Sequence, residues 1–288
     1  MEDFDLSKFT DEDIYKLDEI FAKEKIPFHA RPLRAAQRIL GTAFSISSLN
    51  NSSAKEITDA YKRLIPEVEI WPGDGIGLIA SVDQVKKVII PVVYGTVEIN
   101  IPESLGFTNE ELWQNWCRNN QQIQTNSIFA FADLLDISRG ISAATNIRAK
   151  EFWALAASQL EFLAESLSQS SLPNSSALQP ICLATELAMK GTLLELGISE
   201  TDLKKYGHNL QKLYTEMVNK VSHRDDPLLL KLIPNFPHYV NDRYQETNFT
   251  RLEIIEFALA TQFIVASSIR RISKIDFASE IEKDYSRT

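Results

Sequence analysis

The chain has few residues that bind metals or form disulfides, and this excludes several classes of protein. Its 288 residues contain only two cysteines, Cys117 and Cys182, together with four histidines. Two cysteines far apart in the sequence give neither a disulfide framework nor a zinc-ligand set, and no His or Cys spacing matches a metal site. We therefore predict that the protein uses no metal and no cofactor and works in the reducing cytoplasm.

The sequence also lacks a long hydrophobic run and a surplus of positive charge. Its longest uncharged apolar run, Phe257–Ile269, is shorter than the roughly 20 residues that a membrane span needs. There are 39 acidic and 30 basic residues, so the formal net charge is −9. Proteins that hold nucleic acid through many phosphate contacts usually have a basic surplus. We expect no membrane association and no broad nucleic-acid surface, although a local basic patch could still hold one strand or one nucleotide.

The first half of the chain has the pattern of an α+β domain. A hydrophobic fraction of 44% and a charged fraction of 24% are typical of a soluble globular protein. Thr10 and Asp13 form a capping box before the first helix. Apolar runs on both sides of Gly95 predict a hairpin or meander. The predicted helices are 11–25, 32–40, 54–64, 108–119 and 127–137, and the predicted strands are 78–82, 88–94 and 96–101.

The second half contains no convincing strand and predicts a four-helix bundle. The helices are expected at 148–168, 176–196, 208–221 and 250–275. Two of them begin with capping boxes, Ser176 with Gln179 and Thr250 with Glu253. The connection Ser222–Asn248 contains three prolines and is predicted to be irregular. The middle of the last helix is apolar nearly all round, which is typical of a central or interface helix.

These patterns predict three parts in the chain. Residues 1–140 form an α+β domain, residues 146–277 form the helical bundle, and residues 278–288 form a polar, frayed tail. The whole protein is therefore expected to be mostly helical. The role of the first part is not indicated by any motif, and a protein partner is the simplest expectation for it.

Three short motifs lie in order along the predicted bundle. Glu186 and Lys190 are one turn apart on the second bundle helix. The third helix begins with a Gly-His-x-Leu-x-x-Leu pattern that contains His208. Arg243 and Tyr244 precede the last helix. Together with the four-helix frame, these motifs resemble the HEPN domain family over about the last 130 residues.

The resemblance implies an all-α bundle that forms homodimers and acts in prokaryotic stress or phage-defence systems. It also implies a polar cleft that contacts a nucleotide or RNA through Glu186, Lys190, His208, Arg243 and Tyr244. Each of these residues has a structural reading as well. Glu186 and Lys190 can be an i,i+4 ion pair, which stabilises a helix by roughly 0.2–0.5 kcal/mol. His208 can satisfy a helix start, and Arg243 with Tyr244 can hold the long connection against the bundle.

The sequence departs from the family in its catalytic motif. HEPN ribonucleases typically carry an Arg, four to six further residues, and then a His that moves the proton while the Arg stabilises phosphorane charge. None of the histidines has an Arg at that distance before it: His29, His208, His223 and His238. We therefore predict a binding or dimerisation module without catalysis. The alternatives are a metal-independent endoribonuclease with an atypical site, in which His208 or His223 acts with Arg243, and a pure protein-interaction scaffold.

Three other clusters have both a structural and a functional interpretation. Arg31, Arg34 and Arg38 share a helix face, so they can contact an anion or pair with the acidic first helix. The glycines of the WPGDGIG segment at 71–77 favour a turn, since their spacing matches no phosphate-binding loop. The segment Ser222–Asp226 gathers a His, an Arg and two carboxylates. Capping of a helix end is the simpler explanation of this last cluster, and a magnesium or catalytic role is the functional alternative.

Overall fold

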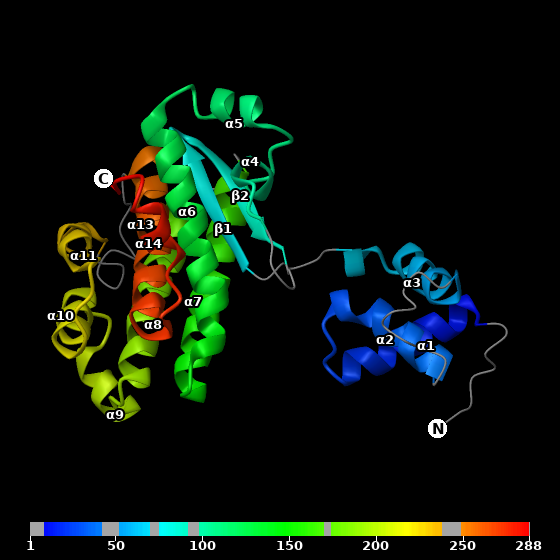
Figure 1. The fold of residues 1–288 in the computed structure, drawn as a ribbon. Helices are drawn as coiled ribbons and strands as arrows, with labels where there is room; N and C mark the ends of the chain where they lie inside the picture. Colours follow the sequence, from blue (N-terminus) through cyan, green and yellow to red (C-terminus); the bar gives the residue numbers. More distant parts are fainter. Residues whose placement is uncertain are drawn as a thin grey trace. The chain divides into compact units, whose positions relative to one another are not determined.

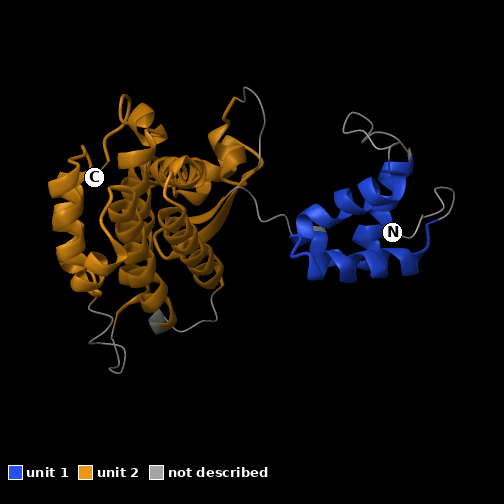
Figure 2. Cartoon of the chain, turned by 90° about the horizontal axis from the view of Figure 1, so that it is seen from below, with its two compact units in different colours: residues 1–72 blue, residues 73–288 orange. Residues whose placement is uncertain are grey.

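A computed structural model describes residues 9–41, 52–69, 75–91, 98–169, 174–237 and 249–287 of the chain. The chain divides into two compact units, Met1–Pro72 (unit 1) and Gly73–Thr288 (unit 2), which Figure 2 colours separately. The described residues are mostly helical and contain one two-stranded antiparallel sheet. The prediction of a mostly helical protein is therefore confirmed.

The described part of unit 1 is helical and has its own hydrophobic core. Ile14, Leu17 and Phe21 follow one another at helical spacing on α1 and are buried with apolar residues of α2 and α3. The buried Tyr61 donates a hydrogen bond of 2.6 Å to Asp18, which joins α3 to α1. The elements are α1 (Asp11–Lys23), η1 (Phe28–Ala30), α2 (Arg31–Leu40), α3 (Ser52–Leu64) and η4 (Pro66–Glu69).

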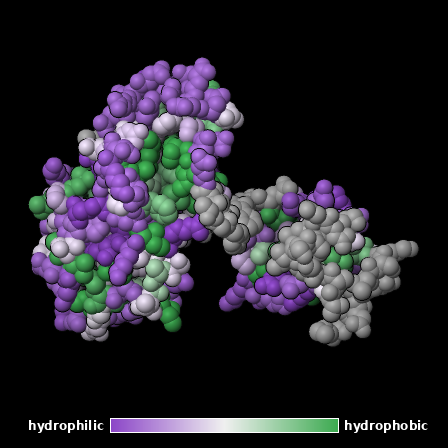
Figure 3. Space-filling model, in the orientation of Figure 1, coloured by the Kyte–Doolittle hydropathy of each residue, from purple (hydrophilic) through white to green (hydrophobic). Residues whose placement is uncertain are grey.

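Unit 2 begins with a β-hairpin and continues with helices, as Figure 1 shows. On the face that Figure 3 presents, hydrophilic side chains surround smaller areas of exposed apolar ones. Its elements are β1 (Gly75–Ser81), β2 (Gln84–Ile90), α4 (Ile101–Ser104), α5 (Glu110–Trp116), α6 (Gln121–Gly140), η5 (Ile141–Ala143), α7 (Ile147–Ser168), η6 (Asn174–Ala177), α8 (Leu178–Glu195), α9 (Glu200–Leu203), η7 (Lys204–Tyr206), α10 (Leu210–Lys220), α11 (Asp226–Leu232), η8 (Ile233–Asn235), α13 (Arg251–Ser273) and α14 (Phe277–Ile281).

One hydrophobic core of unit 2 lies between α7, α8 and α13, and another lies between the hairpin, α5 and α6. The fully buried Trp153 of α7 donates an indole hydrogen bond of 3.2 Å to the carbonyl of Ala188 on α8. Gly191 lies against the same ring, and a Cβ atom there would overlap the indole, so this position requires glycine. The two longest helices of the predicted bundle, α7 and α13, thus pack around a core that their apolar faces predict.

Helix α13 is the central helix, as its apolar middle predicts, since it contacts α6, α7 and α8. It is long and apolar enough to span a membrane by length and composition alone. However, 67% of that apolar window is buried inside the protein, which is the pattern of a core helix in a soluble protein.

The hairpin belongs to unit 2, and this corrects the predicted domain boundary near residue 140. Gln262, buried in the middle of α13, accepts a hydrogen bond of 2.9 Å from the amide of Leu78 on β1. Its side-chain amide donates to the carbonyls of Leu78 at 3.3 Å and of Ala130 on α6 at 2.8 Å. Gly77 leaves the room that this contact needs, because a Cβ would overlap Gln262. The expected α+β domain at 1–140 is therefore divided: its helices up to residue 72 form unit 1, and its strands β1 and β2 belong to unit 2 with α4, α5 and α6. The predicted strand 96–101 is wrong where it is described, because residues 98–100 form no strand and Ile101 begins α4.

The described hairpin has a tight turn that contains a residue with a positive φ angle. Strands β1 and β2 pair antiparallel from Gly75 with Ile90 to Ser81 with Gln84, so the turn consists of Val82 and Asp83. Val82 has a φ angle of +57°, a conformation that β-branched residues rarely adopt. The expected turn at Gly95 lies in 92–97, outside the described residues.

Two of the three predicted capping boxes are present. The side chains of Thr10 and Asp13 cap α1, and those of Thr250 and Glu253 cap α13. The predicted box of Ser176 and Gln179 is wrong, because α8 follows a 3-10 turn, η6, and begins after Ala177 with no side-chain cap.

The connection and the tail are more ordered than expected where the structure describes them. Pro227 and Pro234 lie in the first turns of α11 and η8, where the missing N–H costs nothing, so they begin helical segments inside the predicted loop. The first residues of the predicted frayed tail, up to Ile281, belong to α14. Near its end, Arg287 donates hydrogen bonds to both carboxylate oxygens of Asp133, at 2.7 and 2.8 Å. The C-terminal end of the chain is therefore held by the buried Asp133 of α6, which is distant in the sequence.

Candidate functional site

Three of the predicted site residues meet in one cluster of unit 2. The two carboxylate oxygens of Glu186 accept from different groups, the Lys190 amine at 2.6 Å and the His208 ring nitrogen Nδ1 at 2.9 Å. Helix α8 supplies Glu186 and Lys190, and the short turn before α10 supplies His208. We call Glu186, Lys190 and His208 the Glu186 cluster.

The local backbone explains how His208 reaches α8. Gly207 has a φ angle of +56°, in the region that favours glycine, and it ends the 3-10 turn η7. The helix start is capped by Asn209, whose side chain accepts from the amide of Lys212, so α10 begins at Leu210. The His208 ring is therefore not needed to cap the helix, and it contacts the neighbouring helix instead.

The Glu186 cluster lies between the core and the solvent. The side chains of Glu186 and Lys190 are 10% and 15% exposed, whereas that of His208 is 66% exposed. A carboxylate only accepts hydrogen bonds, so Nδ1 of His208 carries a proton and Nε2 is the acceptor in the neutral ring. The cluster thus combines a held carboxylate, an amine with unused donors and an accessible aromatic ring.

The remaining members of the predicted cleft, Arg243 and Tyr244, lie outside the described residues, as does His238. The last described residue before them is Pro237. Its carbonyl accepts a 3.4 Å hydrogen bond from the thiol of Cys182 on α8. Cys182 precedes Glu186 by one helical turn on the same helix.

A second cluster forms around His223 in the turn between α10 and α11. The ring atom Nδ1 is 3.3 Å from the buried carboxylate of Asp225, and Nε2 is 3.5 Å from the guanidinium of Arg224. Helix α10, which is about 16 Å long, separates His223 from His208, because one residue precedes the helix and the other follows it. The two histidines that are alternatives in the predicted atypical ribonuclease site therefore belong to different clusters.

A buried polar network of unit 2 was not predicted. Arg270 of α13, whose side chain is fully buried, is surrounded by Asp133 and Asp136 of α6 and by Asp225. Asp133 is in direct hydrogen-bond contact, and the oxygens of Asp136 and Asp225 lie at 2.9 and 3.3 Å. Asp276 is 3.9 Å away. We call Arg270, Asp133, Asp136 and Asp225 the Arg270 network. Its members are far apart in the sequence, so no local motif indicates it.

Burial and charge move the pKa values of two carboxyls in the Arg270 network in opposite directions. Burial raises the pKa of Asp136 to about 7, although Arg270 and the amide of Phe277 act against this shift. Burial also acts to raise the pKa of Asp225, but the hydrogen bond from His223 and the charge of Arg270 bring it below its ordinary value. One carboxyl therefore titrates near neutrality, while the other stays ionised.

The arginine face of α2 is largely occupied by partners within unit 1. Arg31 is buried and donates to Asp18 at 2.9 Å and to the carbonyl of Ile26 at 2.9 Å. Arg38 pairs with Glu24 at 2.6 Å, and Arg34 donates to Gln37 at 2.9 Å. The structure therefore places two of the three guanidinium groups against acids of α1 or of its C-terminal end.

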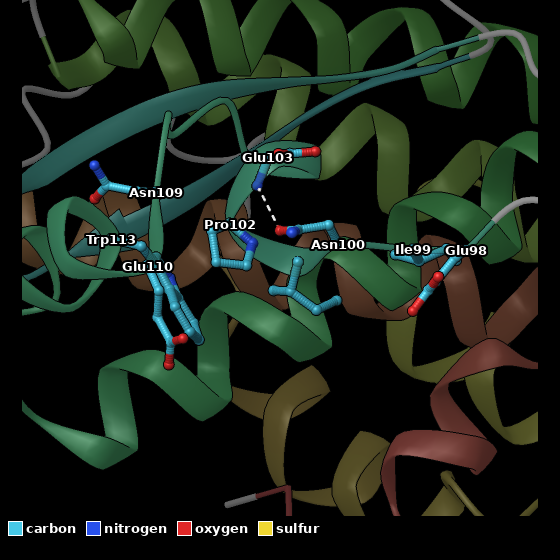
Figure 4. Close-up of a pocket in the computed structure, with 9 residues that line it drawn as sticks. Glu98, Ile99, Asn100, Pro102, Glu103, Asn109, Glu110 and Trp113 are labelled. Atoms are coloured by element: carbon cyan, nitrogen blue, oxygen red, sulfur yellow. Dashed lines mark hydrogen bonds between the residues drawn. The ribbon is translucent and has the colours of Figure 1, made fainter.

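A pocket of about 580 Å³ lies beside α4 and α5 and was also not predicted (Figure 4). Its lining includes three carboxylates, Glu98, Glu103 and Glu110, and the indole of Trp113. The side chain of Asn100 accepts from the amide of Glu103 at 3.2 Å, which fixes this rim. Its charge suits a cation better than a phosphate. Within the described ranges, no three His, Cys, Asp or Glu side chains are grouped as a metal ion requires.

Comparisons with family models, with curated proteins and with solved structures found no match for this chain. A function for the chain is therefore inferred from the geometry of its clusters and from the motifs of its sequence.

Proposed function

We propose that unit 2 is a HEPN-like binding and dimerisation module without catalysis, which contacts a nucleotide or an RNA end at the Glu186 cluster. The observation that supports this proposal is the meeting of Glu186, Lys190 and His208 through hydrogen bonds of 2.6 and 2.9 Å. If these three side chains lay on different surfaces of the protein, the proposed binding site would have no basis.

The chemistry of the cluster suits one nucleotide better than a long strand. The Lys190 amine can contact a phosphate or a base carbonyl, and the exposed His208 ring offers a stacking surface. Glu186 can accept from the N–H groups of a base while it holds both neighbours. A net charge of −9 opposes binding of long nucleic acid through many phosphates. We therefore favour a ligand that is a nucleotide or the end of an RNA.

A homodimer through the bundle, a protein partner for the N-terminal part and a role in prokaryotic stress or phage defence complete this proposal. They rest on the HEPN resemblance of the sequence. Sedimentation of the purified chain tests the dimer, and a monomer at all concentrations would contradict it.

Nucleotide binding is tested by thermal unfolding with a panel of nucleotides and short RNAs. A ligand at 100 times its Kd stabilises the folded protein by about 2.7 kcal/mol. We expect one ligand to raise the Tm of the wild type but not that of Lys190→Met. Lys212→Met is the matched control, because Lys212 is an exposed lysine on α10 outside the cluster. If no ligand stabilises the wild type, unit 2 is a scaffold.

The second candidate function is a metal-independent endoribonuclease. For this candidate, the geometry favours a catalytic site at His223 over one at His208. Asp225 orients the His223 ring at 3.3 Å, and Arg224 lies 3.5 Å from the opposite ring nitrogen. A proton-transferring His beside an Arg is the combination that such chemistry needs. Incubation of total RNA with the protein in EDTA tests this candidate. Cleavage that His223→Ala abolishes would replace the binding proposal with an enzyme.

A further inference from the structure

All three nitrogens of the Arg224 guanidinium contact carboxylates of the C-terminal segment, which we define as residues 276–287. NH1 and NH2 both contact the carboxylate of Asp276, NH2 at 2.9 Å, and Nε donates to Glu282 at 2.6 Å. Paired N–H groups on two oxygens are the arrangement in which arginine binds a carboxylate or a phosphate. Arg224 therefore already presents a complete anion-binding fork.

The same carboxylate also faces His223. An oxygen of Asp276 lies 4.0 Å from Nε2 of His223, while Nδ1 of that ring is held at 3.3 Å by Asp225. Asp276 thus occupies the position between a fixed imidazole and a guanidinium. A tetrahedral phosphate placed there would keep the bonds to Arg224 and gain one from His223 when the ring is protonated.

Solvent access distinguishes Arg224 from the other arginines of this region. Its side chain is 31% exposed, whereas those of Arg270 and Arg271 are fully buried and that of Arg287 is 13% exposed. Asp276 and Glu282 are also partly exposed, and exposed ion pairs contribute little to stability. A dissolved anion can therefore compete with Asp276 and Glu282 for Arg224. The buried arginines are not accessible to such an anion.

The C-terminal segment can release Arg224 without leaving the protein. Its attachment relies on other contacts, namely Arg287 with Asp133 and the amide of Phe277 with Asp136 at 2.6 Å. Asp276 itself caps α14 by accepting from the amide of Ser279 at 3.0 Å, and an asparagine can make that same bond. Rotation of the Asp276 and Glu282 side chains frees the guanidinium and gives up the Asp276 cap of α14, while the contacts of Arg287 and Phe277 stay in place.

We propose that Arg224 and His223 form a phosphate-binding site that the protein's own Asp276 and Glu282 occupy as internal competitors. The ligand class is a phosphate monoester or diester. This site is separate from the Glu186 cluster, since α10 lies between His208 and His223.

The test compares phosphate affinity in variants that remove the competing charges. Inorganic phosphate, a nucleoside monophosphate and a short RNA are titrated into the purified full chain by calorimetry in phosphate-free buffer. We expect Asp276→Asn with Glu282→Gln to bind at least one of these probes about tenfold more tightly than the wild type. Glu280→Gln is the matched control, because Glu280 is a carboxylate of the same segment that pairs with Lys283 and not with Arg224. This control should bind like the wild type.

Adding Arg224→Gln to the double variant should abolish the gain. Near-UV circular dichroism verifies that each variant is folded, and Glu282→Gln alone replaces the double variant if that one unfolds. If the folded variant without the competing carboxylates and the wild type bind all three probes with equal affinity, the proposal is overturned. Arg224 then only holds the C-terminal segment in place. Lys190→Met should not change the gain, so this site and the proposed nucleotide site can fail independently. The three probes identify whether a free phosphate, a nucleotide or an RNA phosphodiester is the preferred source.

Discussion

The Glu186 cluster and the Arg270 network are built from the same kinds of groups but lie at different depths. Each joins carboxylate oxygens to side-chain nitrogen donors of unit 2. In the first, His208 is 66% exposed, whereas in the second the Arg270 side chain is fully buried. A buried charge needs all its partners, while an exposed one can exchange them for water or a ligand. We therefore assign ligand contact to the Glu186 cluster and structural support to the Arg270 network.

Removal of the central cation should cause the largest loss of stability. Arg270→Met leaves Asp133, Asp136 and Asp225 close together and buried without their shared partner. We expect a loss of about 5 kcal/mol, at the upper end for a broken buried pair. Urea unfolding measures it. Arg148→Met is the control, because this exposed arginine pairs with Glu151 on the surface and should cost less than about 1 kcal/mol. If Arg270→Met and Arg148→Met lost similar unfolding free energy, burial would not distinguish the Arg270 network from exposed clusters.

The pH dependence of stability should identify Asp136. Its pKa is about 7 in the folded protein against an ordinary value of 3.8, so the folded state holds a proton there that the unfolded state has lost. The resulting stabilisation is complete below pH 4 and is lost as the pH rises through 7, a change on the order of 4 kcal/mol. Asp136→Asn lacks this titration.

The measurement is the difference in unfolding free energy between the wild type and Asp136→Asn at several pH values. It should change between pH 4 and 7 and be constant above. Asp225, whose pKa is lowered, should act in another window, because its contribution is lost only as the pH falls below about 4. A difference between wild type and variant that does not depend on pH would contradict the assignment of Asp136.

A smaller effect is expected at the C-terminal end. The guanidinium of Arg287 lies 4.4 Å from the ring centre of Phe129 and 4.6 Å from that of Phe263, and it pairs with Asp133. Arg287→Met should cost about 2 kcal/mol, since Asp133 keeps Arg270 as a partner. Thermal unfolding measures this cost. Lys283→Met, a nearby exposed change, should be close to neutral, and an equal effect of the two would show that the tail does not support the core.

The smallest effect on stability should come from His208. The ring is mostly exposed, and Glu186 keeps Lys190 when the ring is removed. His208→Ala should therefore cost less than about 1 kcal/mol in urea unfolding. A loss above about 2 kcal/mol would mean that the ring is a structural element, and the comparison with the Arg270 network would then fail.

Local patterns predicted most of the helices and part of the site. Apolar spacing and the capping residues Thr10 and Thr250 predicted α1 and α13 closely, because these signals act within one helical turn. The pairing of Glu186 with Lys190 follows from their spacing on one helix. The contact of His208 with Glu186 spans a turn, and the family pattern indicated it.

Contacts between distant segments could not be predicted in this way. The hairpin belongs to unit 2 because Gln262 bonds Leu78, and these residues are separated by most of the chain. Its turn contains Val82 in a conformation that favours glycine, so turn preferences do not indicate a turn at this position. The Arg270 network likewise needs α6, α13 and the α10–α11 turn to be packed before its residues meet.

The most direct test of the central claim uses the four histidines as site-specific probes. Nuclear magnetic resonance of the protein labelled with ¹⁵N in histidine is followed during addition of the nucleotide or RNA that stabilises it, with signals assigned through single His→Gln variants. We predict that the ring signals of His208 shift in proportion to bound ligand, while those of His29 in unit 1 do not change. A ligand that leaves the His208 signals unchanged while the protein is saturated would contradict the assignment of the Glu186 cluster as the binding site.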